Sequence, residues 1–99
     1  MRRAARKDDT HKAVKSALEA LDCFVLDLNG AIDFLVHDRQ TNRLHAVDAK
    51  THQPYKSWER LTDTQTDLIA SGFPLELCYG ADDAASMVKR WRQSPASSS

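Results

Sequence analysis

Apolar residues recur along the chain at two different spacings, which separates helical segments from strands. Val14, Leu18 and Leu21 lie three or four residues apart, the period of one face of an α-helix, and predict an amphipathic helix over residues 10–22. Short apolar runs, bounded by turn residues such as Asn29-Gly30, predict strands after this helix. The three expected strands are residues 23–28, 32–37 and 44–50.

The second half of the chain changes from a loop pattern to helix, strand and helix patterns. Residues 51–61 contain Pro54 and have no clear period, so we expect a loop there. Thr62 and Gln65 have the spacing of a capping box, and Gly72 marks the end of the helix that this box begins. The expected helix, strand and final helix are residues 63–70, 74–79 and 82–92.

These elements, in the order helix, three strands, helix, strand, helix, predict an α/β fold. Short turns favour antiparallel pairing of the first three strands, and the helix before the fourth strand favours a parallel crossover. Because both faces of the strands carry apolar residues, we expect a central four-stranded mixed sheet flanked by helices on each side. A single domain over residues 10–92 would follow a basic arm, residues 1–9, and precede a disordered tail, residues 93–99.

The composition favours a soluble intracellular domain with no membrane partner. The 99 residues are 41% hydrophobic and carry a formal net charge of zero. No apolar run approaches the ~20 residues that a bilayer span needs. No signal-peptide core follows the basic N-terminus, so we expect a cytoplasmic location. Cys23 and Cys78 lie inside apolar runs without metal-ligand spacing, and we interpret them as buried free thiols.

Positive charge is more clustered than the neutral total suggests. Basic side chains gather near the N-terminus and in the expected loop, and such clusters can contact the phosphates of a nucleic acid. The candidate DNA-binding residues are Arg2, Arg3, Arg6, Lys7, His52, Lys56 and Arg60. His37 and His45 show no metal-ligand spacing, and we interpret them as surface or loop residues.

Two acidic residues and one lysine are expected to share one patch of the sheet. If the hairpin of the second and third strands turns between Gln40 and Thr41, paired residue numbers sum to 81. Asp33 then faces Asp48, with Cβ atoms about 5 Å apart. Lys50, two residues after Asp48, points to the same face. Directly opposed carboxylates repel each other, so this patch needs a compensating charge.

A divalent cation suits two carboxylates at this separation, because Mg²⁺ and Mn²⁺ take oxygen ligands. Asp33, Asp48 and the backbone carbonyl of Ala49 are the candidate ligands. Such an ion binds a phosphate oxygen and lowers the pKa of an attacking water. Lys50 is placed to position that water or to stabilise charge on the phosphate. The pattern indicates phosphodiester hydrolysis.

The same residues resemble a known signature. Asp33, followed after fourteen residues by Asp48-Ala49-Lys50, resembles the motif of the PD-(D/E)xK nuclease superfamily. The nearest likeness is to the small stand-alone VRR-Nuc type nucleases of phages and to the Holliday-junction resolvases. Three stretches carry it: residues 30–36 resemble their G-x-P-D-L-L-V segment, residues 44–50 their L-x-x-x-E-V-K strand, and residues 61–65 their L-T-P-D-Q helix start.

This resemblance, which covers about residues 7–91, implies a restriction-endonuclease-like core in the order α-β-β-β-α-β. It implies a Mg²⁺- or Mn²⁺-dependent endodeoxyribonuclease that hydrolyses phosphodiester bonds of branched DNA, acts as a homodimer and works in the cytoplasm, including that of a phage host. Asp33 and Asp48 would hold the metal and Lys50 would assist the attacking water. Gln65 would orient the site or contact the scissile phosphate.

The chain departs from this family pattern at two positions of the site. Asp48 stands where glutamate is commoner, which stays within the latitude of the motif. The family often has a metal-binding acid on its first helix, and no acid here is an obvious match. His11 or Asp9 lies at about the right place and is preferred over Glu19.

Several of these residues have simpler interpretations. Gln65 can serve as a helix cap, His11 as a partly buried helix residue, and Asp48 with Lys50 as an exposed ion pair. Asp33 can be a turn residue. The whole chain can be a catalytically inactive nuclease-fold module that binds DNA or protein, or an interaction domain unrelated to nucleic acid.

Overall fold

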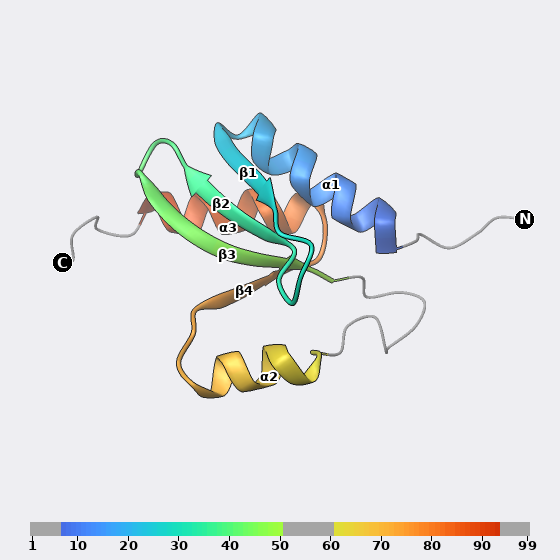
Figure 1. Cartoon of the computed structure of the whole chain (residues 1–99). Coiled ribbons are helices and arrows are strands. Elements are labelled where there is room, and N and C mark those ends of the chain that lie inside the picture. The colour runs from blue at the N-terminus through green and yellow to red at the C-terminus, as the bar shows by residue number, and fades with distance from the viewer. Residues whose placement is uncertain (1–6, 51–60, 94–99) are drawn as a thin grey trace, which may run out of the picture.

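The computed structural model describes residues 7–50 and 61–93, which form three helices and four strands (Figure 1). In chain order they are α1 (Lys7–Ala20), β1 (Cys23–Asp27), β2 (Phe34–Asp38), β3 (Arg43–Ala49), α2 (Asp63–Ala70), β4 (Leu75–Cys78) and α3 (Ala81–Gln93). The predicted α/β class and element order are confirmed. None of these helices has the length and apolar character that a bilayer crossing requires.

The four strands form one mixed sheet in the order β1-β2-β3-β4. The pairs β1–β2 and β2–β3 are antiparallel and β4 is parallel to β3, as the connections predict. Phe34 pairs with Val47 and Asp38 pairs with Arg43, so the numbers of each pair sum to 81. The predicted register of this hairpin is therefore correct.

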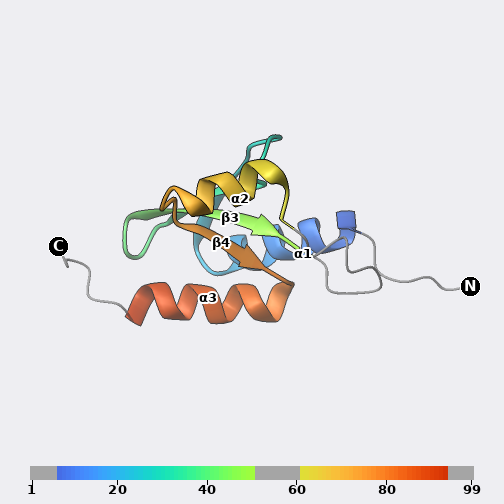
Figure 2. The same cartoon turned by 90° about the horizontal axis from the view of Figure 1, so that it is seen from below.

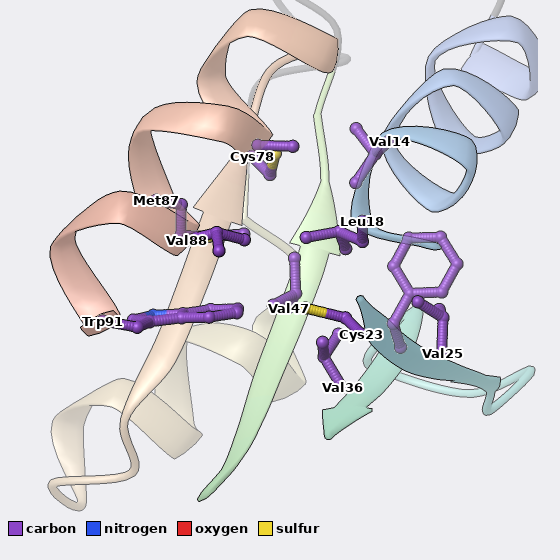
Figure 3. Close-up of a cluster of buried hydrophobic side chains, with 12 residues drawn as sticks. Val14, Leu18, Cys23, Val25, Val36, Val47, Cys78, Met87, Val88 and Trp91 are labelled. Carbon is purple, nitrogen blue, oxygen red and sulfur yellow. The ribbon is translucent and has the colours of Figure 1, made fainter. Parts of the chain in front are cut away.

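Helices lie on both faces of the sheet, with α1 and α3 on one face and α2 on the other (Figures 1 and 2). The core fills the space between the sheet and the helices α1 and α3, where apolar side chains point toward one another (Figure 3). Its buried members are Val14, Leu18, Cys23, Val25, Phe34, Val36, Val47, Cys78, Ala84, Met87, Val88 and Trp91. Both cysteines are buried and free, as predicted.

The face that carries α2 is only partly covered, because this helix packs against β4. Large apolar side chains of the described ranges that remain exposed are Phe24, Leu26, Leu28, Leu44 and Ile69. Asp48 belongs to the same face as Leu44, four residues before it, but is buried. The covered part of this face is thus the part that surrounds Asp48.

Several element ends and one side chain differ from the expectation. β2 begins at Phe34 rather than at residue 32, and α3 includes Gln93, which was expected in the disordered tail. α1 begins at Lys7 rather than at residue 10, and it ends at Ala20 because the chain turns into β1 through Asp22, whose φ is 67°. His45, expected at the surface, has a side chain only 14% exposed and stacks on Trp91 with ring centroids 3.6 Å apart. The reason is strand alternation, which turns residue 45 toward the core face of β3.

A buried ion pair joins the end of α3 to the β2–β3 hairpin. Asp38 is fully buried, and its Oδ1 lies 2.9 Å from Nη2 of Arg92 and 3.0 Å from the N–H of Gln40. Burial alone would raise the pKa of Asp38, but these hydrogen bonds and the Arg92 charge outweigh it and hold the pKa below its usual range. The carboxylate is therefore a stabilising group at neutral pH.

Replacing this carboxylate should destabilise the fold in a pH-dependent way. We expect Asp38→Asn to lower the free energy of unfolding at pH 7 by about 3 kcal/mol, because Arg92 loses its buried partner. Since the folded pKa is depressed, the contribution is complete above the unfolded pKa of about 4 and disappears as the pH falls through the folded pKa. Urea denaturation of both proteins at pH 7 and pH 3 measures the difference.

The matched control is Asp22→Asn, which removes a carboxylate from an exposed ion pair with Arg39, 3.4 Å away. We expect it to change the free energy of unfolding by less than about 1 kcal/mol. Equal losses in the two variants would contradict the role of the Asp38–Arg92 pair.

Candidate functional site

Asp33 and Asp48 meet at the end of the sheet where β2 begins and β3 ends. Asp33 lies one residue before β2, and the register that pairs Phe34 with Val47 places it opposite Asp48. The N–H of Asp33 donates to Oδ1 of Asp48 at 3.0 Å, and the N–H of Ala49 donates to Oδ2 of Asp33 at 2.8 Å. The predicted opposition of the two acids is confirmed, and each carboxylate is held by a backbone N–H of the other strand.

Lys50 completes the predicted patch. Its Nζ lies 3.1 Å from Oδ2 of Asp48, and the two residues are only 7% and 4% exposed. The pair is therefore buried, and the alternative of an exposed strand-edge ion pair is wrong. A buried ammonium next to a carboxylate is costly to desolvate, so further hydrogen bonds are needed to hold it.

Gln65 supplies one of these hydrogen bonds and links α2 to the sheet. Its Oε1 accepts from Nζ of Lys50 at 3.0 Å and from the N–H of Thr62 at 3.1 Å, while its Nε2 donates to the carbonyl oxygen of Ala31 at 2.6 Å. Thr62 accepts in return from the N–H of Gln65, which completes a capping box. One amide, 2% exposed, therefore serves both as helix cap and as partner of the lysine.

His11 brings α1 to the same end of the sheet. Its Nδ1 lies 3.8 Å from Oδ1 of Asp33, and its Nε2 lies 3.0 Å from Oδ1 of Asp27. The imidazole also packs against Phe34, with ring centroids 4.4 Å apart. Of the first-helix candidates, Asp9 is exposed in the first turn, and Glu19 is exposed about two turns beyond His11.

Asp27 is the one residue of this group that sequence reasoning missed. It ends β1 and pairs across the ladder with Phe34, so it lies next to the start of β2. Oδ2 of Asp27 is 2.7 Å from Nζ of Lys15, one turn after His11 on α1. The register of the β1–β2 hairpin could have placed Asp27 near Asp33, but its contact with α1 depends on helix packing.

The surroundings of the Asp33 carboxyl disfavour its ionised form. Burial raises its pKa, the hydrogen bond from the N–H of Ala49 lowers it, and the negative charge of Asp48 raises it again, with a net rise above the ordinary value. The ionised form is thus under-stabilised by the protein alone. A cation placed between the two acids would favour that form.

The donor atoms fit a hard divalent cation. The carboxylates of Asp33 and Asp48 each accept a hydrogen bond from the backbone of the opposite strand. Oxygen is the ligand type that Mg²⁺ and Mn²⁺ prefer. Within residues 7–50 and 61–93, no group of three or more His, Cys, Asp or Glu side chains is placed to hold a metal ion. An ion here would therefore complete its shell with the carbonyl of Ala49, with water or with substrate oxygens.

The candidate DNA-binding residues lie almost entirely outside the described part of the chain. Residues 1–6 and 51–60, which include Arg2, Arg3, Arg6, His52, Lys56 and Arg60, are not described. Lys7 is the first residue of α1.

Comparison of the chain with protein-family models, with curated proteins and with solved structures gave no match. The functional argument therefore depends on the geometry of these residues.

The buried amide of Gln65 should be important for stability. We expect Gln65→Leu to lower the free energy of unfolding by about 2–3 kcal/mol, because Lys50 and the Ala31 carbonyl lose a buried partner. Thr66→Leu, an exposed position on the same helix, is the control and should change it by less than about 0.5 kcal/mol. Equal effects in urea denaturation would contradict the assignment.

The coupling of the two acids can be measured directly. We expect Asp33 to titrate above its ordinary value, and we expect Asp48→Asn to lower the pKa of Asp33 by removing the neighbouring charge while keeping an oxygen for the Asp33 N–H. Carboxyl carbon NMR across a pH titration of the metal-free proteins measures the pKa of Asp33 in the wild type and in Asp48→Asn. An unchanged pKa of Asp33 in the variant would show that Asp48 does not act on it.

Proposed function

We propose that the protein is a metal-dependent endodeoxyribonuclease with a restriction-endonuclease-like core. The observation that carries the proposal is the convergence of the half-buried Asp33 with the buried Asp48 and Lys50 on one patch at the end of two paired strands. Two acids and a lysine are the groups that phosphodiester hydrolysis with a divalent ion uses. An interaction domain has no need of opposed carboxylates in a site that raises the pKa of one of them.

The proposed fold follows from the element order. α1, the three antiparallel strands, α2 and the parallel β4 occur in the order α-β-β-β-α-β, and α3 follows them. This order agrees with that of the PD-(D/E)xK core that the sequence resembles, and Asp33, Asp48 and Lys50 are the residues whose spacing resembles its motif.

Asp33 and Asp48 are the residues that would hold the ion, together with the carbonyl of Ala49. A divalent ion bound there supplies a phosphate-binding Lewis acid and acidifies a bound water. Lys50 is a buried ammonium beside Asp48, and it would hold the attacking water by hydrogen bonding and offset charge that develops on the phosphate. Gln65 fixes the ammonium in this position through Oε1.

Branched DNA is the substrate class that the resemblance favours. The described residues contain one such site, so cutting two strands symmetrically would require a homodimer. The basic residues near the N-terminus and within residues 51–60 would contact the phosphates of the DNA.

An inactive DNA- or protein-binding relative is the second candidate. It is favoured by the place of His11, which occupies the region where the family often has a further acid. In that case the protein would bind DNA without cutting it in any metal.

Nuclease assays separate these two functions. We expect cleavage of a four-way junction or a plasmid with Mg²⁺ or Mn²⁺, no cleavage with EDTA, and a loss of about 10²–10³-fold in Asp48→Asn and in Lys50→Met. Asp67→Asn, at an exposed position on α2, is the control and should cut at the wild-type rate. Circular dichroism melts check that each variant is folded.

Binding without cutting in both metals would favour the inactive module. Cleavage that survives in a folded Asp48→Asn variant would contradict the proposed site. Neither binding nor cutting of any DNA would support an unrelated function.

A further inference from the structure

We infer that β1 is the edge at which two copies of this chain join, by antiparallel pairing of β1 with the β1 strand of the second copy. The pairing makes one continuous sheet from the four strands of each copy. A homodimer belongs to the proposed function, on which this inference rests, but the surface that forms it does not follow from the resemblance. Three properties favour a second copy as the occupant: the free backbone groups of β1, its exposed apolar side chains and the charges of α1.

One edge of β1 has backbone groups that no described strand pairs with. β1 is the first strand in the order β1-β2-β3-β4, so β2 occupies only one of its two sides (Figure 1). In the register of these two strands, the N–H of Leu28 donates to the carbonyl oxygen of Asp33. Because the direction of these groups alternates along a strand, the N–H and C=O groups of Cys23, Val25 and Asp27 point away from β2.

A second copy pairs all of these groups in a single register. A two-fold axis at Val25 places this residue opposite the partner's Val25, and it places Cys23 opposite the partner's Asp27. Each of these pairs exchanges two backbone hydrogen bonds. Phe24 and Leu26 then form the closer pairs without backbone hydrogen bonds, in which side chains of opposite strands touch. Because both copies use the same surface, the contact closes at two copies.

The apolar side chains of β1 gain from this arrangement. Phe24 and Leu26 are 57% and 46% exposed although both are large and apolar. They lie on the face opposite the core, and α2 on that face packs against β4, at the other edge of the sheet. In the register above, Phe24 of each copy contacts the partner's Leu26, so that four apolar side chains form one cluster. Removal of this surface from water favours the association.

β1 lacks the features that usually protect an edge strand from pairing. Such strands commonly carry proline, lysine or a bulge. β1 has the sequence Cys-Phe-Val-Leu-Asp, without proline or lysine, and it pairs with β2 without a bulge. Its one charged residue, Asp27, is neutralised by Lys15, whose Nζ lies 2.7 Å from Oδ2. The edge is therefore open to a further strand.

The charges of α1 are complementary across the two-fold axis. Lys12, Lys15 and Glu19 are three or four residues apart and share one side of the helix. Lys15 contacts the end of β1 through Asp27, whereas Glu19 is near the start of β1, because α1 ends at Ala20 and β1 begins three residues later. Antiparallel pairing brings the start of β1 to the end of the partner's strand, and so brings Glu19 to the side of the partner's Lys15. α1 also contacts β3 and α3, so it is set back from the edge.

Such a dimer places two copies of the candidate site on one sheet. Asp33 lies beside Leu28, just beyond the end of β1. Antiparallel pairing therefore puts the two sites at opposite ends of the paired strands. The two-fold axis is perpendicular to the sheet, so both sites belong to the same face. One DNA molecule that crosses the paired strands can contact both, as symmetrical cutting requires.

The test is analytical ultracentrifugation of the protein without metal or DNA. We expect a monomer–dimer equilibrium with a dissociation constant in the micromolar range for the wild type. Phe24→Lys/Leu26→Lys places two lysines opposite each other on both sides of the axis and should weaken the association about 100-fold. Phe24→Lys/Leu26→Glu places opposite charges at the same positions and should associate about tenfold more tightly than the double-lysine variant, an advantage that high salt removes. Circular dichroism melts check that the variants are folded.

Leu44→Lys is the matched control, because Leu44 is 65% exposed on the same face but belongs to β3, away from the edge. It should leave the association unchanged. This inference would be overturned by a wild type that stays monomeric throughout the micromolar range, by equal association of the two double variants, or by equal losses in Leu44→Lys and in the double-lysine variant. A monomer that cuts DNA with Mg²⁺ would leave the nuclease proposal standing. A dimer of this register that cuts no DNA in any metal would overturn the nuclease proposal and leave the interface.

Discussion

Two carboxylates face each other across adjacent strands, and the structure around them limits their repulsion. Each acid accepts a backbone N–H from the opposite strand, and Lys50 places a positive charge against Asp48. The compensation is unequal, since Asp33 has no such cation at hydrogen-bond distance among its described contacts and its pKa stays raised. A chain selected only for stability would replace one of these acids, because opposed like charges cost free energy.

Elements from both faces of the sheet converge on this pair. α2 reaches it through Gln65, whose amide also binds the loop before β2, and α1 reaches it through His11. The acids themselves belong to the strand ends between these helices. A site assembled in this way is held by the same contacts that dock the helices, so its geometry is set by the fold as a whole.

Residues close in sequence were the easiest to predict. The β2–β3 register follows from strand alternation and from a short polar turn, and it alone determines that Asp33 opposes Asp48. The capping box of α2 needs only the spacing of Thr62 and Gln65. Asp27 was missed because its partners are on α1, and the angle at which a helix crosses a sheet is not encoded in any local pattern. The surface position expected for His45 was wrong because it was inferred from the polarity of the side chain alone. Strand alternation places residue 45 on the core face of β3.

The ion pair of Asp38 with Arg92 bears on the order in which the elements of the chain fold. The two residues are 54 positions apart, and Arg92 lies in the last turn of α3. The hairpin that carries the acids can form early from local contacts, but the buried Asp38 on that hairpin remains without its cation until α3 docks. A contact between residues so far apart in the sequence must overcome the entropy of closing a long loop, whereas the hairpin needs only local contacts. We therefore expect the strands that carry Asp33 and Asp48 to form before α3 docks on them.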